Sequence, residues 1–379
     1  MIIYYHDPDT HFYPLDLFRH QAKLLIGTTP FWQRRKGMFL IPSYLKGLYA
    51  EPRCRGVCIY LKATVIIEDK LPSLKQDTVL ESKEGVVIGA VITTDPYPQD
   101  SEDLIKRIRT IKDKKRLRAV EFRSLWEMVD QNGKVIISDY SGPSREGSVD
   151  KRATILGKDL AMARGTKIDP GAIIDTRSGP VIIGEKVWIK SNSVIEGPAY
   201  IGPETIIEGA KVRPGTTIGK NCRIGGEVET SIILDFTNKH HDGFIGHSYI
   251  GSWVNLGALT TNSDLKNNYH QVRIRYKDKS FETGLLKVGC FIGDHVKTGI
   301  GTLIPTGCVI GPFTNVFGGG MVERFIPAFR WGSPGKYQDY DLERAIETAK
   351  LVMSRRGVRL DKNYEKVIRT VYQRERTGK

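Results

Sequence analysis

The chain has 379 residues, of which 40% are hydrophobic and 26% are charged, and its formal net charge is +14 at pH 7. This composition is typical of globular proteins and excludes a largely disordered or fibrous chain, while the length favours two or more domains. The longest apolar runs, such as Gly85–Ile92, fall well short of the roughly 20 residues that a membrane span needs, so no membrane span is predicted.

The positive charge raises the question of a polyanionic partner. The basic residues are interspersed with acidic ones, as in residues 106–116 and 355–362, and they lack the aromatic interleaving of an RNA-binding sheet. We therefore predict small phosphorylated ligands and no nucleic-acid partner.

The cysteines bear on the compartment. They are odd in number and widely scattered, at positions Cys54, Cys58, Cys222, Cys290 and Cys308. The N-terminus also has no basic segment ahead of its apolar residues, which makes it a poor secretory signal. These features predict a cytoplasmic protein with reduced thiols.

Residues 1–137 predict an α/β domain, because short apolar runs such as Ile2–Tyr5 and Val86–Ile92 alternate with polar loops. One helix is expected to open at Ser101, and a second amphipathic stretch runs from Phe122 to Val129. Serine, glycine and proline cluster at positions 139–150, so residues 138–164 are predicted to be a linker.

From about residue 165 the apolar pattern takes a period of six, which fits neither a helix nor a plain strand. The in-phase positions are Ile183, Ile189, Ile195 and Ile201, then Ile206, Val212, Ile218 and Ile224 after a slip of one, and later Leu286, Ile292, Thr298, Ile304, Ile310 and Val316. A triangular coil with one inward side chain on each flat side has this period. Residues 165–335 are therefore predicted to form a left-handed parallel β-helix.

Two segments depart from this period. Between about residues 262 and 284 it is lost, and we expect a loop that leaves the coil and carries functional side chains. Residues 336–379 predict helices, with Leu342, Ile346, Ala349 and Val352 on one face, and these helices are expected to cap the open end of the coil.

The stretch NKHHDGFIGHSYIG, residues 238–251, brings together His240, His241 and His247. Residue type alone leaves three roles open: a catalytic base, a metal ligand or a satisfied polar side chain. Some hexad-repeat enzymes bind zinc through histidines of adjoining subunits, but their ligand spacing is not seen here, and no metal site is predicted.

The run GGEVETSIILDFTNKHHDGFIGHSYIGSWVNLGALTTNSDLKNNY, residues 225–269, resembles the GlmU-like family, most closely its divergent alternative branch. The resemblance continues at residues 125–132, 210–215 and 325–332, and it is weak over the first 100 residues. This family pairs a sugar-phosphate nucleotidyltransferase domain with a hexapeptide-repeat domain that acetylates glucosamine-1-phosphate. The resemblance implies acetyl-CoA as substrate, amino-sugar phosphate and nucleotide-sugar ligands, a role in UDP-N-acetylglucosamine and cell-envelope synthesis, and a homotrimer.

The same resemblance implies roles for individual residues. The family's base precedes an aliphatic-Gly-x3-aliphatic-Gly element by a fixed spacing, which selects His241, with Asp242 or Glu227 to orient its ring. Phe244 departs from the family pattern, which has a tyrosine there, and this leaves the acceptor sugar open. The implied substrate-binding residues are Arg213, Glu227, Asn255, Asp264 and Lys266, and those implied for acetyl-CoA are Gly257, Ala258, Lys297 and Thr298.

The chemistry needs a base for the amine proton, a donor for the developing oxyanion and positive charge for phosphates. Imidazole suits the first role because its ordinary pKa lies near 6.5. A backbone N–H of Gly257–Ala258 suits the second. Arg213 suits the third, and Lys266, Arg273, Arg275 and Lys277 on the interrupting loop are further candidates for phosphate contacts.

The N-terminal domain fits the family less well. It lacks the glycine-rich loop, and it keeps only Pro14, Leu15, Arg19 and Gly27 of the alternative branch's motif. Mg2+ is therefore predicted only if this domain transfers uridylyl groups. Two rival hypotheses follow: a decayed sugar-nucleotide-binding or scaffold subunit, and an acetyltransferase for another amino sugar.

Overall fold

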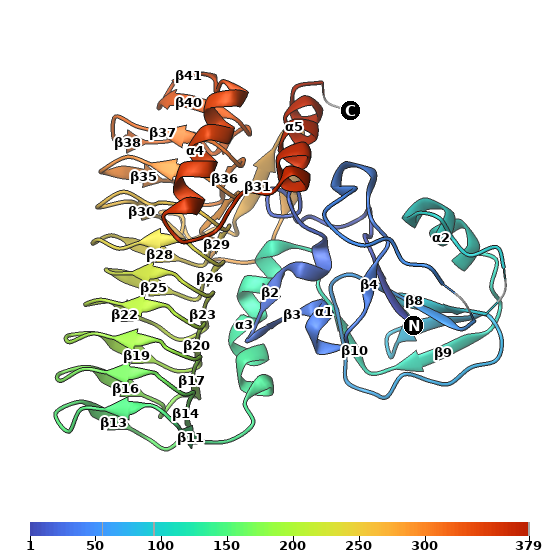
Figure 1. The fold of residues 1–379 in the computed structure, drawn as a ribbon, viewed down its shortest axis with the longest axis horizontal. Coiled ribbons are helices and arrows are strands. Elements are labelled where there is room, and N and C mark those ends of the chain that lie inside the picture. The colour runs from blue at the N-terminus through green and yellow to red at the C-terminus, as the bar shows by residue number, and fades with distance from the viewer. Residues whose placement is uncertain (55, 94, 378–379) are drawn as a thin grey trace.

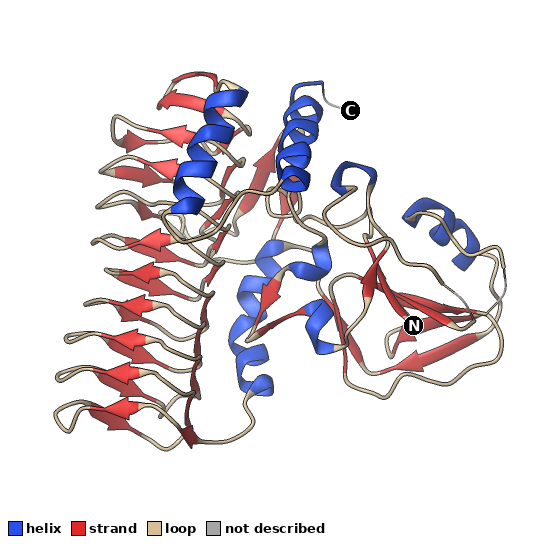
Figure 2. Cartoon of the chain, viewed as in Figure 1, coloured by secondary structure: helices blue, strands red, loops and turns tan. Residues whose placement is uncertain are grey.

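A computed structural model describes residues 1–54, 56–93 and 95–377. The chain forms an α/β domain beside a long parallel β-helix, with two C-terminal helices packed between and along them (Figure 1). The colouring by secondary structure shows strands stacked along the whole β-helix (Figure 2). The predicted fold class is confirmed.

The N-terminal domain is built on a six-stranded mixed sheet in the order β4-β1-β5-β8-β7-β9. These strands are β1 (Ile2–Tyr5), β4 (Met38–Phe39), β5 (Cys58–Lys62), β7 (Thr78–Ser82), β8 (Val87–Ile92) and β9 (Lys114–Leu117). Smaller elements are β2 (Leu25–Ile26), β3 (Thr29–Pro30), β6 (Val65–Ile67), β10 (Ala119–Glu121), α1 (Phe31–Arg34), α2 (Ser101–Ile108), and the 3-10 turns Gln21–Lys23 and Ser43–Leu45. The cap of α2 is Asp100, whose carboxylate accepts from the Asp103 N–H, one residue before the predicted start.

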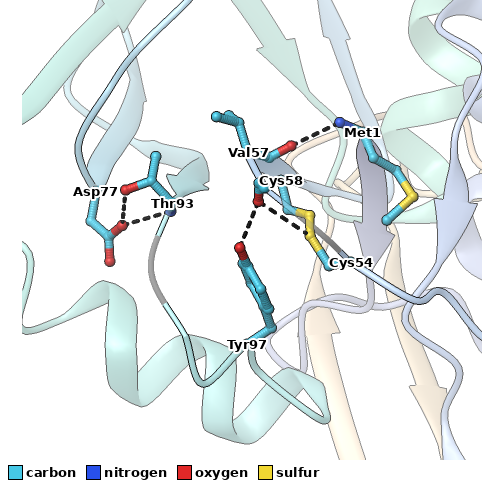
Figure 3. Close-up of a disulfide and its surroundings, with 8 residues drawn as sticks. Met1, Cys54, Val57, Cys58, Asp77, Thr93 and Tyr97 are labelled. Carbon is cyan, nitrogen blue, oxygen red and sulfur yellow. Dashed lines mark hydrogen bonds between the residues drawn. A yellow bond between two sulfur atoms is a disulfide. The ribbon is translucent and has the colours of Figure 1, made fainter.

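Cys54 and Cys58 form a disulfide at the start of β5 (Figure 3). Their Cα atoms lie 6.3 Å apart, within the usual range for such a bond. The prediction of reduced thiols is wrong for this pair, whose cysteines are four residues apart in the sequence. Cys222, Cys290 and Cys308 are free and buried.

Helix α3 (Leu125–Asp139) joins the domain to the β-helix and packs on it. It begins after Ser124, whose hydroxyl accepts from the Glu127 N–H. In its middle the buried Asn132 accepts from the Gly27 N–H and donates to the Gly215 carbonyl, at 2.8 Å in both cases. One amide thereby ties the N-terminal segment to a β-helix coil.

The β-helix has three faces, here called face 1, face 2 and face 3, each made of strands that pair in parallel with the equivalent strand one coil away. Face 1 contains β11 (Ser144–Arg145), β14 (Leu160–Met162), β17 (Val181–Ile183), β20 (Ala199–Ile201), β23 (Thr216–Ile218), β26 (Ile232–Ile233), β29 (Tyr249–Ile250), β33 (Cys290–Ile292), β36 (Cys308–Ile310) and β39 (Phe325–Ile326). Face 2 contains β12 (Ser148–Val149), β15 (Lys167–Ile168), β18 (Trp188–Ile189), β21 (Ile206–Ile207), β24 (Arg223–Ile224), β27 (Asn238–Lys239), a bridge at Asn255, β34 (Lys297–Thr298), β37 (Asn315–Val316) and β40 (Arg330–Ser333), closed by the antiparallel β41 (Lys336–Asp339). Face 3 contains β13 (Thr154–Leu156), β16 (Ile173–Asp175), β19 (Val194–Glu196), β22 (Lys211–Val212), β25 (Glu227–Glu229), β28 (Phe244–Gly246), β30 (Thr261–Asn262), β35 (Thr302–Ile304) and β38 (Gly320–Met321).

The hexad positions fill the interior of the coil, as predicted, with two exceptions. Ile207, and not Ile206, points inward, because it pairs with the buried Ile224. Leu286 lies on the interrupting loop and is exposed. The remaining in-phase residues are all buried.

The β-helix begins earlier than predicted. Residues 144–164, expected to belong to a linker, already carry β11 to β14 and pair with the following coils. Their inward positions include Leu160 and Met162, which the isoleucine series does not reveal. The true connection between α3 and the first coil is therefore short.

The interrupting segment contains a hairpin of β31 (Arg273–Tyr276) and β32 (Lys279–Glu282). Its Tyr276 ring stacks on Tyr13 with centroids 5.1 Å apart, and Phe281 packs against His11. The hairpin thus docks on the N-terminal domain.

The C-terminal helices α4 (Leu342–Ser354) and α5 (Lys362–Thr377) pack along the side of the β-helix, and not over its open end as predicted. Their apolar faces cover a ladder of stacked rings at the corner between faces 1 and 2. The ladder consists of Phe236, Trp253, His295, Phe313 and Phe329. The helices thereby bury their apolar faces on the aromatic ladder.

Candidate functional site

His241 lies in the turn His240–Gly243, which joins β27 on face 2 to β28 on face 3. The side chain is exposed, and its ring lies 5.3 Å from that of His240. His240 Nε2 is 2.8 Å from Glu208 Oε2, so His240 is fixed while His241 stays open to solvent. We call this part of the coil, where face 2 meets face 3, the His241 corner.

The next turn along the coil axis, Gly257–Thr260, stacks directly on the His241 turn. The Leu259 N–H donates to the Asp242 carbonyl at 2.8 Å, and Asn255 bridges to Asn238. Equivalent backbone positions in neighbouring coils are roughly 4.8 Å apart. The structure therefore places the turn that carries His241 beside the segment that carries Asn255, Gly257 and Ala258.

The two backbone donors of the Gly257–Ala258 segment differ. The Gly257 N–H is engaged by both the carbonyl and the hydroxyl of Thr298, each at 3.1 Å. Thr298 itself is buried and shares a 2.8 Å hydrogen bond with the Thr260 hydroxyl. Thr298 thus supports this turn from inside and engages the Gly257 N–H.

Arg213 and Glu227 lie on face 3, two strands and one strand from Phe244, respectively. The guanidinium donates to Glu227 Oε1 at 3.0 Å and to Glu196 Oε2 at 3.1 Å. These bonds, that to Glu227 first, raise the pKa of Arg213. Glu227 is therefore held by Arg213 and does not orient the His241 ring. An anionic ligand that binds Arg213 would have to compete with the carboxylates of Glu227 and Glu196.

A side chain that the sequence analysis missed lies beneath the His241 turn. Lys239 is 2% exposed and occupies an inward position of face 2, where it pairs with Ile224. Its ammonium donates to the Gly225 carbonyl at 2.9 Å and to the His241 carbonyl at 3.0 Å. Burial lowers the pKa of Lys239 to about 8, against the opposing charges of Asp242 and Glu227.

Asp264 and Lys266 lie elsewhere, at the corner where face 3 meets face 1, which we call the His247 corner. Asp264 Oδ2 is 2.7 Å from His247 Nδ1, and both side chains are largely buried. Burial acts to raise the pKa of Asp264, but the bond to His247 and the charge of Lys287 outweigh it, so the pKa is lowered. Lys266 donates to the Gln271 carbonyl at 2.6 Å and so braces its own loop.

The other basic candidates are also engaged away from the His241 corner. Lys297 lies under α4 and donates to the carbonyls of His295 and Trp253 at 2.9 and 3.3 Å. On the hairpin, Arg273 pairs with Glu282, and Lys277 pairs with Glu375 of α5. These contacts fix the hairpin and the C-terminal helices to the rest of the chain.

The N-terminal segment that resembles the family's nucleotide loop serves the domain interface. Arg19 donates to Asp294 Oδ2 of the β-helix at 2.5 Å, and Tyr249 of face 1 donates to the Leu25 carbonyl at 2.8 Å. A cavity of about 850 Å³ lies at the carboxyl ends of β1 and β4, lined in part by Asp16, Gln21 and Arg374. Among residues 1–54, 56–93 and 95–377, no group of three or more His, Cys, Asp and Glu side chains is placed to hold a metal ion.

No helix in the described part of the chain is long and apolar enough to cross a membrane. The stacked hexad coils define the class of this protein, a hexapeptide-repeat β-helix protein. No protein-family model matches the chain.

Known proteins narrow this class. A bifunctional sugar-1-phosphate nucleotidylyltransferase/acetyltransferase of Sulfurisphaera tokodaii is 38% identical over 154 residues, which is 38% of this chain and 37% of that protein. The uncharacterized acetyltransferase YaiX of Escherichia coli O6:K15:H31 is 31% identical over 171 residues, or 44% of this chain and 74% of that protein. A solved structure of the Francisella novicida UDP-N-acetylglucosamine acyltransferase covers 56% of this chain and 74% of its own at 17% identity, with a TM-score of 0.33.

The resemblance to the GlmU-like family identified in residues 225–269 is confirmed by the Sulfurisphaera relative, and the chain belongs with the acetyltransferases of the YaiX kind. The matched part of this chain spans only 37% of the length of the Sulfurisphaera relative.

Proposed function

We propose that the protein is an acetyl-CoA-dependent N-acetyltransferase that acts on an amino-sugar phosphate, with glucosamine-1-phosphate as the first acceptor to test. The observation that carries the proposal is the stacking of the His241 turn on the Gly257–Thr260 turn, joined by the hydrogen bond from the Leu259 N–H to the Asp242 carbonyl. It places the backbone of the exposed His241 about one coil spacing from the backbone of Ala258.

In the proposed reaction, the amine nitrogen of the sugar attacks the thioester carbonyl carbon, and His241 takes the amine proton. The Ala258 N–H donates to the oxyanion of the tetrahedral intermediate. Collapse of the intermediate breaks the C–S bond, and coenzyme A leaves and is protonated to the thiol. Arg213 and Asn255 hold the sugar phosphate, for which Arg213 would exchange a carboxylate for a phosphate partner.

We further propose a homotrimer in which neighbouring copies cover an apolar edge next to the His241 corner. This apolar edge consists of Leu259, Ile300, Leu303, Phe317 and Met321, which are 41 to 73% exposed. Clustered exposed apolar side chains are unusual on a monomer. Light scattering after gel filtration should give three times the mass of the chain, and the Leu259→Asp/Ile300→Asp variant should elute as a monomer; a wild type that is monomeric at micromolar concentration contradicts the trimer.

The experiment that tests the reaction incubates the purified protein with acetyl-CoA and glucosamine-1-phosphate and measures free thiol. We expect thiol release that depends on both substrates and a product that carries an N-acetyl group. Other amino sugars and their nucleotide derivatives form the acceptor panel, because Phe244 replaces the family's tyrosine. No thiol release above background with any acceptor would reject the proposal. The use of acetyl-CoA assigns the reaction to the cytoplasm.

A sugar-nucleotide-binding scaffold is the second candidate function. It is favoured by Arg19, which pairs with Asp294 where a nucleotidyltransferase would use its loop for a triphosphate. Calorimetry with UDP-N-acetylglucosamine distinguishes the two: binding without turnover of either half-reaction would support the scaffold.

A further inference from the structure

Lys239 stands on an inward line of face 2 whose other members are uncharged and mostly aliphatic, with Thr298 as a polar exception. The inward residues on the same line of face 2 include Ile189, Ile207, Ile224 and Val316, all buried in the core of the coil. A buried charge in such a line is costly unless it is paired and hydrogen-bonded. This cost indicates that the ammonium has a role that an aliphatic side chain could not take.

The surrounding backbone is shaped to receive the ammonium. Gly226 has a φ of +65°, and a Cβ on it would lie 2.6 Å from Lys239 Nζ. A Cβ on Gly225 would lie 2.0 Å from the His240 carbonyl oxygen. The glycine pair therefore leaves room for the ammonium between two consecutive coils.

One end of this arrangement is the backbone of the proposed base. Nζ donates to the carbonyls of Gly225 and His241, and thereby joins two consecutive turns of the His241 corner. The His241 side chain itself is exposed, and the backbone beneath it sets where the imidazole points. A buried donor below an open side chain can fix position without blocking substrate.

We propose that Lys239 is a positioning residue for the proposed acetyl transfer: its ammonium, bound between the carbonyls of Gly225 and His241, fixes the turn that presents the His241 imidazole to the acceptor amine. The inference rests on the proposed function for its kinetic consequence. Its structural part, the fixing of the turn, is measurable without activity.

The first test is Lys239→Met, which keeps the length of the side chain and removes the donor. We expect kcat to fall at least about tenfold while the KM for acetyl-CoA stays within about twofold, because misplacement of a reacting group lowers the rate of the chemical step. The melting temperature should not fall, since replacing a buried charge by an apolar residue of similar volume is often neutral or stabilising. An unchanged kcat in a folded Lys239→Met protein overturns the proposal.

The second test leaves Lys239 in place and displaces its ammonium by Gly226→Ala. The matched control is Gly209→Ala, at the equivalent corner one coil earlier, because Gly209 has a similar φ of +60° and no atom within 4 Å of an added Cβ. Both variants place an alanine at a positive φ, but only the added Cβ of Gly226→Ala meets Lys239 Nζ, at 2.6 Å, and the Gly243 carbonyl oxygen, at 2.7 Å. We therefore expect kcat to fall at least about tenfold more in Gly226→Ala. Equal kcat values in the two glycine variants overturn the proposal even if Lys239→Met fails to fold.

Hydrogen exchange separates this inference from the proposed function. Amides of residues 240–243 should exchange at least about tenfold faster in Lys239→Met than in the wild type, with exchange in the first coils unchanged. Faster exchange in a protein whose wild type releases no thiol would reject the proposed function and keep the positioning role of Lys239. Unchanged exchange rejects that role.

Discussion

The His241 corner and the His247 corner lie on the same coil, and they use histidine in opposite ways. His241 is exposed and its only ring contact among the described residues is with His240. His247 is largely buried and has a carboxylate partner, Asp264, at 2.7 Å. Viewed as isolated geometry, the His247 pair looks more like the base and orienting acid of a hydrolase.

The surroundings of each corner decide between them. The His241 turn stacks on the turn that carries Ala258, whereas His247 lies where the interrupting segment leaves the coil, and its carbonyl accepts from the Gly289 N–H at the point where the chain returns. His247 and Asp264 therefore join the two ends of the excursion. The comparison teaches that a fixed imidazole is not by itself a base: the reacting groups must also be near.

The largest effect should come from His241→Ala. We expect kcat to fall at least about a hundredfold, because the amine proton loses its acceptor, with little change in melting temperature at this exposed site. Steady-state thiol release and thermal unfolding measure the two quantities. If His241→Ala keeps its rate and His247→Ala loses it, the assignment of the two corners is reversed.

His247→Ala should act mainly on stability. Removing the imidazole leaves the Asp264 carboxylate in a largely buried place without its closest partner, which costs about 1–3 kcal/mol. Urea unfolding should show this loss, and limited proteolysis should cut the segment 263–289 sooner. The double variant with Asp264→Asn is the control, since a neutral amide needs no counter-ion and should recover part of the loss.

Much of this fold can be predicted from the sequence, because a β-helix places apolar residues inward at a regular interval. The hexad series identified the coil, and the motif that follows His241 predicted its neighbours Asn255 and Ala258. The start at Ser144 was missed because Leu160 and Met162 replace isoleucine in the early coils. These positions differ from the series in residue type and not in burial.

Contacts between distant parts of the chain were not predictable. Lys277 and Arg273 have the residue type of phosphate ligands, and only the fold shows that the hairpin docks on the N-terminal domain and pairs Lys277 with Glu375. The sequence pattern indicates Lys239 only weakly, as a lysine at an inward position of the coil that follows Gly225 and Gly226. Periodicity predicts where side chains point, whereas hydrogen-bond partners depend on how coils stack.

The two corners should respond to pH in the same direction but over different pH intervals. The pKa of Asp264 is lowered in the folded protein from its ordinary 3.8, so its stabilising effect is present above that pH and is lost as the pH falls through the folded value. Burial lowers the pKa of Lys239 from 10.5 to about 8, so between these values the unfolded chain binds more protons. Its free energy of unfolding should therefore rise as the pH increases over this interval.

Urea unfolding between about pH 8 and 10 measures the alkaline effect, which we expect to be of the order of 1 kcal/mol for each buried lysine. Lys297, whose pKa burial also lowers to about 8, contributes a second rise of the same sign. Lys239→Met should remove its own share and leave that of Lys297. A slope that does not differ between wild type and Lys239→Met would show that Lys239 is not a buried ammonium.

The smallest effect concerns the acceptor at the His241 corner. Phe244 follows the His241 turn on face 3, and its ring lies over Gly246, where an added Cβ would come within 2.5 Å of the ring. Phe244→Tyr adds one hydroxyl at the edge of the proposed sugar site, and one neutral hydrogen bond is worth about 0.5–1.5 kcal/mol. The KM for glucosamine-1-phosphate should therefore fall about two- to tenfold while kcat stays within about twofold, if this sugar is the acceptor. Gly246→Ala displaces the ring without adding a hydroxyl and should raise KM for every acceptor; its Cβ would also meet Asp264 Oδ2 at 2.6 Å, so its melting temperature is measured alongside. A Phe244→Tyr enzyme whose KM falls for a different amino sugar, and not for glucosamine-1-phosphate, would identify Phe244 as the residue through which this chain changed its acceptor.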